Sequence, residues 1–173
     1  MKVAEYINYF ETIARNLKAI SHNPEAKKIR FVTGNIDELL GGLRSKLDTK
    51  EPCLILYNFE GSFFEAPDEA KSLSMQSGFA VIQNVQENNF KEQDTKSDNL
   101  LEICTDILSK ILNDREEHDA GNFCPSFISD FDFNSVKITY IGRLGDNAYG
   151  WFCEFDITNN ADKLLKYNPS KWA

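Results

Sequence analysis

Few side chains in this sequence have the types and spacing that catalysis or metal binding requires. The run Glu-Glu-His-Asp at 116–119 is the one place where a histidine adjoins carboxylates. Neighbouring residues at a helix end point in different directions, whereas a metal needs converging ligands, so this run predicts a solvated helix end. The other histidine, His22, lies before Pro24 and has no partner close in sequence. We therefore expect no histidine-based metal centre.

The carboxylates also lack the spacing of a catalytic site. Residues 67–71 (Pro-Asp-Glu-Ala-Lys) resemble a compressed nuclease signature. Metal-dependent phosphodiester cleavage needs carboxylates that converge from separate strands, which two adjacent acids in a loop do not provide. Asp130, Asp132 and Asp156 could converge on a hard cation, but they fall on the solvent side of the expected strands. We expect no catalytic residue, no cofactor and no bound metal.

Cysteine usage and the absence of long apolar runs predict a cytoplasmic protein. Cys53, Cys104, Cys124 and Cys153 form no Cys-x-x-Cys pair, and three of them lie in apolar segments. This pattern predicts buried free thiols in a reducing compartment. No run approaches the roughly 20 apolar residues of a membrane span, and the first residues are too polar for a signal peptide. We expect no association with a membrane.

Apolar side chains in polar surroundings are a stronger functional signal. Phe63 and Phe64 lie among charged residues between positions 60 and 77, a segment that also contains Met75, and Trp172 is next to the last residue. These side chains either pack back on their own domain or contact another chain, because aromatic residues anchor protein interfaces. The second interpretation makes Phe63, Phe64, Met75 and Trp172 the candidate interface residues.

The segment 97–117 is the strongest predicted helix, and the strands predicted before and after it should pack against it. Its apolar residues recur at helical spacing and fill an arc of roughly 140°. Leu100, Cys104, Ile107, Leu108 and Ile111 belong to this set, and polar residues take the opposite side. Such a helix covers one face of a small sheet.

Two further helices are predicted in the first fifty residues. Residues 2–20 keep one apolar face in phase, and Pro24 follows soon after. Residues 29–32 are compatible with a short strand. Asn35 and Glu38 have the spacing of a capping box at the start of another helix, which Gly41 and Gly42 should kink or break.

The remaining sequence predicts antiparallel strands. Residues 53–57 form a continuous apolar run typical of an interior strand, and 78–85 should pair with it. The residues between them, 60–77, either extend the strands into a projecting hairpin or fold back over the core. Residues 136–141 and 149–157 alternate with period two across a turn and should form a second hairpin. We predict an α+β fold with four or five strands and helices on one face.

Composition fits one domain and argues against general nucleic-acid binding. The chain has 173 residues, 42% hydrophobic content and a net charge of −8, whereas phosphate contacts need clustered Lys and Arg. We expect a single domain over 1–173, with a helical part over about 1–50, a sheet-and-helix core over about 51–158 and a tail over 159–173.

The order of elements from Pro52 to Ile157 resembles that of the tail-terminator and neck proteins of tailed phages and related contractile particles. The segment 149–155 (Tyr-Gly-Trp-Phe-Cys-Glu-Phe) looks like the Gly-Trp-x-x-x-Phe closing strand of some of these proteins. The resemblance implies a non-enzymatic structural subunit that assembles into a homo-oligomeric ring, often a hexamer, and contacts other particle proteins. It also implies that the 60–77 segment makes the contacts between subunits.

Two other functions are compatible with the sequence. The chain could be a cytoplasmic bacterial adaptor or small-ligand-binding protein that uses a groove between sheet and helices. It could also be a metal-dependent hydrolase whose carboxylates meet only in the folded chain. Light scattering distinguishes a ring from a monomeric binder.

Overall fold

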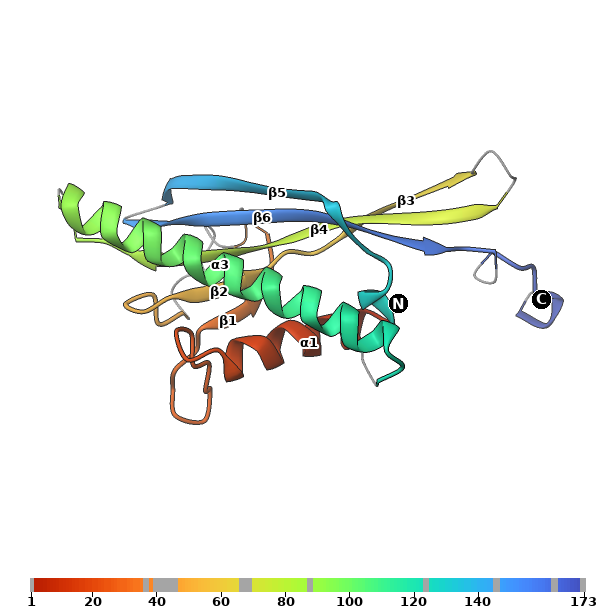
Figure 1. The fold of residues 1–173 in the computed structure, drawn as a ribbon, viewed down its shortest axis with the longest axis horizontal. Coiled ribbons are helices and arrows are strands. Elements are labelled where there is room, and N and C mark those ends of the chain that lie inside the picture. The colour runs from red at the N-terminus through yellow and green to blue at the C-terminus, as the bar shows by residue number, and fades with distance from the viewer. Residues whose placement is uncertain are drawn as a thin grey trace.

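The computed structural model describes residues 2–35, 38, 47–65, 70–86, 89–122, 125–144, 147–162 and 165–171. The helical elements are α1 (Val3–Asn16), α3 (Phe90–Asp119) and the short 3₁₀ turns η2 (Ser126–Ile128) and η3 (Pro169–Lys171). The strands are β1 (Phe31–Thr33), β2 (Cys53–Leu56), β3 (Glu60–Glu65), β4 (Lys71–Asn84), β5 (Phe131–Leu144) and β6 (Ala148–Asn160). The predicted α+β class is confirmed, with six strands in the described residues (Figure 1).

The sheet is built around the long antiparallel pair of β4 and β6. Its order is β1-β2-β4-β6-β5, and β3 also pairs with β4. Ser72 to Asn84 lie opposite Asn160 to Ala148 without interruption. β2 pairs antiparallel with β4, as predicted, and the short β1 runs parallel to β2. The predicted hairpin of 136–141 with 149–157 is also present, as β5 and β6.

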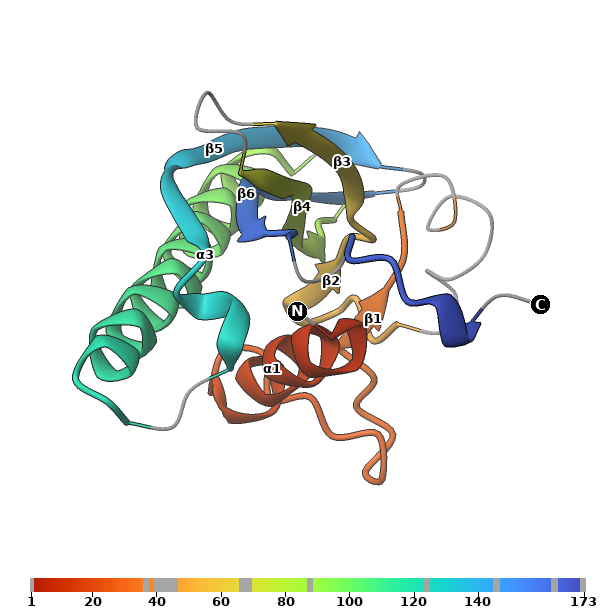
Figure 2. The same ribbon diagram turned by 90° about the vertical axis from the view of Figure 1, so that its right-hand side faces the viewer.

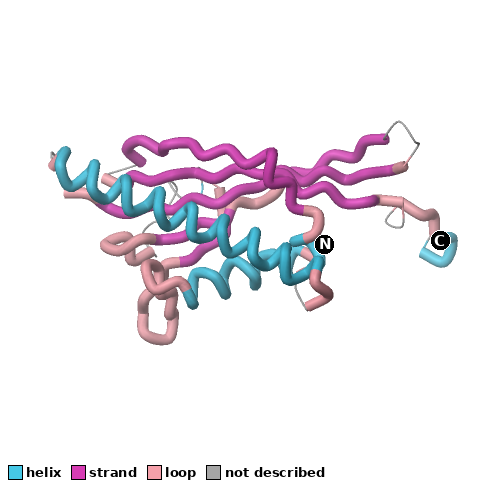
Figure 3. Tube along the Cα trace, viewed as in Figure 1, coloured by secondary structure: helices cyan, strands magenta, loops and turns pink. Residues whose placement is uncertain are grey.

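Both long helices pack on the same face of the sheet (Figures 2 and 3). Helix α3 buries the face that the sequence predicted, and Ile103 is buried with it. The Trp151 indole on β6 donates a hydrogen bond of 2.9 Å to the Ser97 carbonyl oxygen on α3, which ties the helix to the centre of the sheet. Helix α1 covers the β1–β2 side. Its Phe10 ring reaches the middle of the sheet and stacks on the ring of Phe155 of β6, with 6.2 Å between the ring centroids.

The opposite face of the sheet has a second, smaller cluster of buried side chains. It consists of Leu47, Cys53, Ile55, Ala80, Ile82 and Ala148. All four residues of β2 are buried, as expected for an interior strand with both faces covered. Leu47 is the one described residue of this cluster that lies outside the strands.

An irregularity between β2 and β3 divides the molecule into a covered part and a projecting part. Both strands follow the same edge of β4, but Tyr57, Asn58 and Phe59 stand opposite only two residues of it. The Ser77 hydroxyl donates to the Tyr57 carbonyl oxygen at 3.0 Å and lies 2.9 Å from the Tyr6 hydroxyl. Such a bulge bends the strand while its polar groups stay paired. Beyond it, β3 continues the pairing with β4, so the 60–77 segment is a hairpin and does not fold back over the core.

Three element boundaries differ from the sequence-based prediction. Helix α3 begins at Phe90 rather than near Ser97, because Asn89 accepts the Glu92 amide hydrogen and the polar first turns extend a helix already held by its packed part. Helix α1 ends at Asn16 rather than near residue 20, since Leu17 is extended and a turn follows. Strand β5 begins at Phe131 rather than at residue 136, shortly after η2. Most of the helix predicted after Asn35 lies outside the described residues.

Candidate functional site

The most distinctive surface feature is a three-stranded extension, which we call the ribbon. It consists of β3, residues 71–76 of β4 and residues 156–160 of β6. The ribbon extends past the end of the helical layer (Figure 1). Every residue of β3 is exposed. The part of the sheet that no helix covers therefore carries an edge strand open to solvent.

Three of the four candidate interface residues from the sequence, Phe63, Phe64 and Met75, lie on this ribbon, and they differ in exposure. Phe63 is 58% exposed and Phe64 is 46% exposed. Phe63 lies opposite Leu73, which packs against the helix-side core, so the two phenylalanines point to opposite faces of the ribbon. Met75 is only 5% exposed and belongs to the chain's own core. Trp172 lies outside the described residues.

The other end of the sheet order also ends in an exposed strand. β5 is the strand beyond β6, and most of its side chains are exposed. On the helix side it presents Phe133, Ile138 and Tyr140, each about two-fifths exposed. The Tyr140 ring meets that of Trp151 at 5.2 Å, and its hydroxyl accepts a hydrogen bond of 3.0 Å from the Gln93 amide.

Sequence reasoning missed these β5 residues as surface candidates. Their alternation correctly indicated a strand, but alternation cannot tell an edge strand from a central one, because both have one apolar face. An apolar groove of about 390 Å³ separates this strand from α3. It is lined by Leu108, Leu112, Phe133, Val136 and Ile138, together with Thr105 and Ser109.

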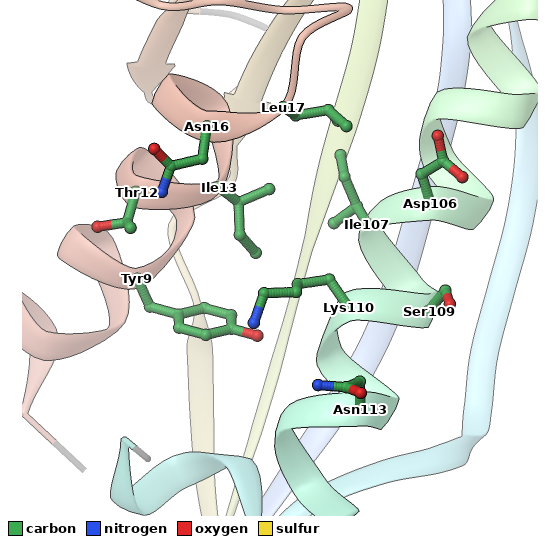
Figure 4. Close-up of a pocket in the computed structure, with 10 residues that line it drawn as sticks. All are labelled: Tyr9, Thr12, Ile13, Asn16, Leu17, Asp106, Ile107, Ser109, Lys110 and Asn113. Atoms are coloured by element: carbon green, nitrogen blue, oxygen red, sulfur yellow. The ribbon is translucent and has the colours of Figure 1, made fainter. Parts of the chain in front are cut away.

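A second concave site lies between the two helices. This groove has a volume of about 500 Å³, and ten residues of α1, α3 and the chain just after α1 line it (Figure 4). Ile13, Leu17 and Ile107 form its apolar part, while its polar lining consists of Tyr9, Thr12, Asn16, Asp106, Ser109, Lys110 and Asn113. Tyr9 and Lys110 reach toward each other across the groove from opposite helices (Figure 4).

Two lining residues of this groove, Tyr9 and Lys110, bind a buried carboxylate, that of Asp114. The Tyr9 hydroxyl donates to Asp114 Oδ2 at 2.7 Å, and the Lys110 ammonium forms an ion pair with Asp114 Oδ1. Asp114 is buried, so both of its oxygens exchange water for a donor within the protein. This arrangement ties α1 to α3 across the groove. No sequence signal identified it, because Tyr9 and Asp114 are 105 positions apart.

The acidic and histidine residues considered from sequence form no metal site within the part of the chain that the structure describes, and Asp68 and Glu69 lie outside it. Asp132 and Asp156 are cross-strand neighbours, and burial raises the pKa of Asp130 above its usual range. His118 lies 3.7 Å from the Asp119 carboxylate beside it. Among the residues that the structure describes, no group of three His, Cys, Asp or Glu side chains could hold a metal ion.

The described cysteines Cys53, Cys104 and Cys153 are buried free thiols, as their apolar surroundings predicted. Burial raises the pKa of the Cys53 thiol to about 12. Cys104 of α3 lies within hydrogen-bonding contact of Cys153 on β6, which together with burial raises the pKa of Cys104. Cys124 lies outside the described residues. All three side chains are packed in the core. The raised pKa values of Cys53 and Cys104 keep these two thiols protonated, so they are not poised as nucleophiles.

Comparison with protein-family models, with curated proteins and with solved structures finds no significant match to this chain. Within the described ranges, neither long helix has an apolar stretch that could cross a bilayer.

Proposed function

We propose that this chain is a non-catalytic structural subunit that assembles with copies of itself into a ring. The ring would act as a tail terminator or neck component of a phage or phage-like particle, alongside other particle proteins. The observation that supports this proposal is the ribbon, whose exposed outer strand β3 extends past the helical layer and presents Phe63 and Phe64. The same segment is the one that the family resemblance assigns to subunit contacts.

An exposed edge strand with aromatic side chains is costly to leave in water. Unpaired backbone groups on such an edge are a template for another strand, and natural monomers block them with short strands, bulges or charges. β3 has a charge only at each end, Glu60 and Glu65, and between them lie Gly61, Ser62 and the two phenylalanines. A partner that covers this edge would bury both aromatic rings. A net charge of −8 also suits a ring through which DNA passes without binding.

The proposal is tested by measuring the mass of the purified full chain over a concentration series, using light scattering and negative-stain microscopy. We expect a closed ring for the wild type. The double variant Phe63→Ser with Phe64→Ser should shift the distribution toward monomer. Leu17→Ser is the control, because Leu17 is half-buried in the groove between α1 and α3, away from the ribbon, and its replacement should leave assembly unchanged.

Two outcomes would contradict this proposal. A wild-type chain that stays monomeric at every concentration excludes a self-assembling subunit. A ring that persists unchanged in the double variant excludes the ribbon as the contact. Circular dichroism of each variant verifies that the fold is retained.

The groove between α1 and α3 favours a second candidate function, the binding of a small amphipathic molecule. The groove sets three apolar side chains beside several polar ones that could orient a ligand, and its volume of about 500 Å³ falls in the range of small-ligand sites. A thermal-shift screen of small amphipathic compounds against the wild type and Asn113→Trp tests this. Asn113→Trp would fill the groove and abolish any shift, whereas Glu102→Trp, on the same helix outside the groove, would retain it. A screen without a wild-type shift contradicts this function.

A further inference from the structure

We infer that the exposed edge strands β3 and β5 are complementary, and that β3 of one copy pairs antiparallel with β5 of the next copy. This inference rests on the proposed self-assembly and names the surface that receives the ribbon. The receiving surface is the edge strand β5, in particular residues 138–143, and the partner is a second copy of this chain.

The strand directions support this pairing. β3, β4, β6 and β5 lie side by side in that order, and each is antiparallel to its neighbour. The first and last strands of this series therefore run in opposite directions. When a second copy is placed beside the first in the same orientation, its β5 is antiparallel to β3. The sheet then continues from copy to copy with all helices on one side.

The side chains of the two edges match in this arrangement. Phe63 is on the helix side of the sheet, because it lies opposite Leu73, and Tyr140 is on the same side, because it lies opposite Trp151. A register that places Phe63 opposite Tyr140 brings two partly exposed aromatic rings together on one face. Aromatic cross-strand pairs are among the most favourable in antiparallel sheets.

The charges on the two edges are opposite in sign. β3 carries the acidic residues Glu60 and Glu65 and no basic residue. Residues 136–144 of β5 carry the basic residues Lys137 and Arg143 and no acidic residue. In the register that joins Phe63 to Tyr140, Glu60 lies level with the irregularity between Ile141 and Leu144, which contains Arg143. Opposite charges across an interface favour the correct partner and register, which matters here because whole copies with a charge of −8 repel each other.

The position of the two edges along the sheet predicts a staggered ring. Phe63 lies opposite Leu73 of β4, which in turn lies opposite Asn159 of β6. Tyr140 lies opposite Trp151 of β6, eight residues before Asn159 in that strand. At about 3.3 Å per residue, the neighbour is displaced along the strands by about 26 Å. This displacement explains why the ribbon projects beyond the helices, since it must reach along the neighbour. The contact is head-to-tail, so it closes into a ring or continues as a filament.

Charge reversal tests the pairing. Glu60→Lys and Arg143→Glu should each lower the apparent association constant about 5- to 10-fold, and the chain that carries both should recover to within about 2-fold of the wild type. Glu25→Lys is the charge-matched control, because Glu25 is exposed in the bend after α1, and it should not weaken assembly in this way.

Cysteine cross-linking tests the register. A mixture of Phe63→Cys and Tyr140→Cys chains should form a mixed disulfide dimer under mild oxidation, whereas each variant alone should give only the background of the parent chain. Replacing Tyr140→Cys with Thr139→Cys in the mixture should abolish the cross-link. Thr139 is the neighbouring residue, and it lies opposite Phe152 on the other face.

The outcomes separate this inference from the proposed function. Rings that form normally but show neither recovery in the charge-swapped chain nor the mixed disulfide overturn the β3–β5 pairing and leave the ring proposal standing. Cross-linking of Tyr140→Cys chains to each other overturns it in favour of a two-fold contact through β5. A monomeric wild type overturns both proposals, and a mixed disulfide within open filaments supports the pairing while contradicting the ring.

Discussion

Replacing Gly150 with alanine tests the close approach of the two central strands on which this architecture depends. Gly150 is buried on β6, opposite Ile82 of β4. A Cβ atom at this position would overlap the Val81 carbonyl oxygen and would lie 2.9 Å from both the Cα and a side-chain carbon of Ile82. Two of these three atoms belong to the backbone, so a rotamer change cannot relieve the overlap. The strands β4 and β6 would have to separate locally.

The expected cost follows from this overlap. Overpacking in a core costs about 1–3 kcal/mol and occasionally more, and a weakened ladder hydrogen bond adds about 0.5–1.5 kcal/mol. We expect Gly150→Ala to lower the free energy of unfolding by about 3 kcal/mol, which for a chain of this size lowers the Tm by about 6–12 °C. Urea unfolding and calorimetry measure both quantities.

The matched control is Gly142→Ala on the edge strand β5, where an added Cβ meets nothing within 4 Å. Alanine loses less backbone entropy than glycine on folding, so this variant should be unchanged or up to about 1 kcal/mol more stable. If both variants melt within a degree of the wild type, the close approach of β4 and β6 is absent and the reasoning fails.

Three further predictions concern single contacts. Tyr9→Phe removes the hydroxyl that donates to buried Asp114 and should cost about 1.5–3 kcal/mol in urea unfolding; an unchanged midpoint would show that the contact between the helices is absent. Asn89→Ala removes the cap of α3 and should cost about 1 kcal/mol, and an equally stable variant would place the helix start elsewhere. His22 is 6% exposed, its Nδ1 accepts the Arg30 amide hydrogen at 2.9 Å, and burial lowers its pKa below 6.5. The buried neutral imidazole therefore contributes to stability above pH 6.5, and this contribution is lost as the pH falls through the lowered pKa. His22→Asn should lose less stability between pH 7.5 and 5.5 than the wild type. An unchanged dependence of the unfolding free energy on pH would contradict the lowered pKa of His22.

Some elements could be predicted because their signals are local. The apolar spacing from Leu100 to Ile111 is enough to orient α3, and the alternation from Trp151 to Ile157 is enough to show which side chains of β6 face the helices. The four-residue apolar run of β2 likewise indicated a strand buried on both faces. In each case the apolar pattern within one segment indicates which of that segment's side chains are buried.

Other elements could not be predicted, because they depend on partners distant in sequence. The first turns of α3 have no apolar periodicity, and their helical state follows from a cap and from the packed part of the same helix. Of the four interface candidates, Phe63 and Phe64 are exposed and Met75 is buried, although all three lie in the same polar segment. Phe63 and Met75 lie on the same face, so their exposure depends on how far along the ribbon the helix-side core reaches.

By itself, the sequence determined an α+β chain with a leucine- and isoleucine-rich helix over a sheet and a second hairpin near its end, because hydrophobic periodicity within a segment fixes its type and its buried face. Only the tertiary structure decided that β3 and β5 are exposed edge strands on opposite sides of the β4–β6 pair and that Tyr9 of α1 meets Asp114 of α3. Strand order and side-chain contacts between distant segments arise from long-range pairing, and a period-two pattern fits several such pairings equally well.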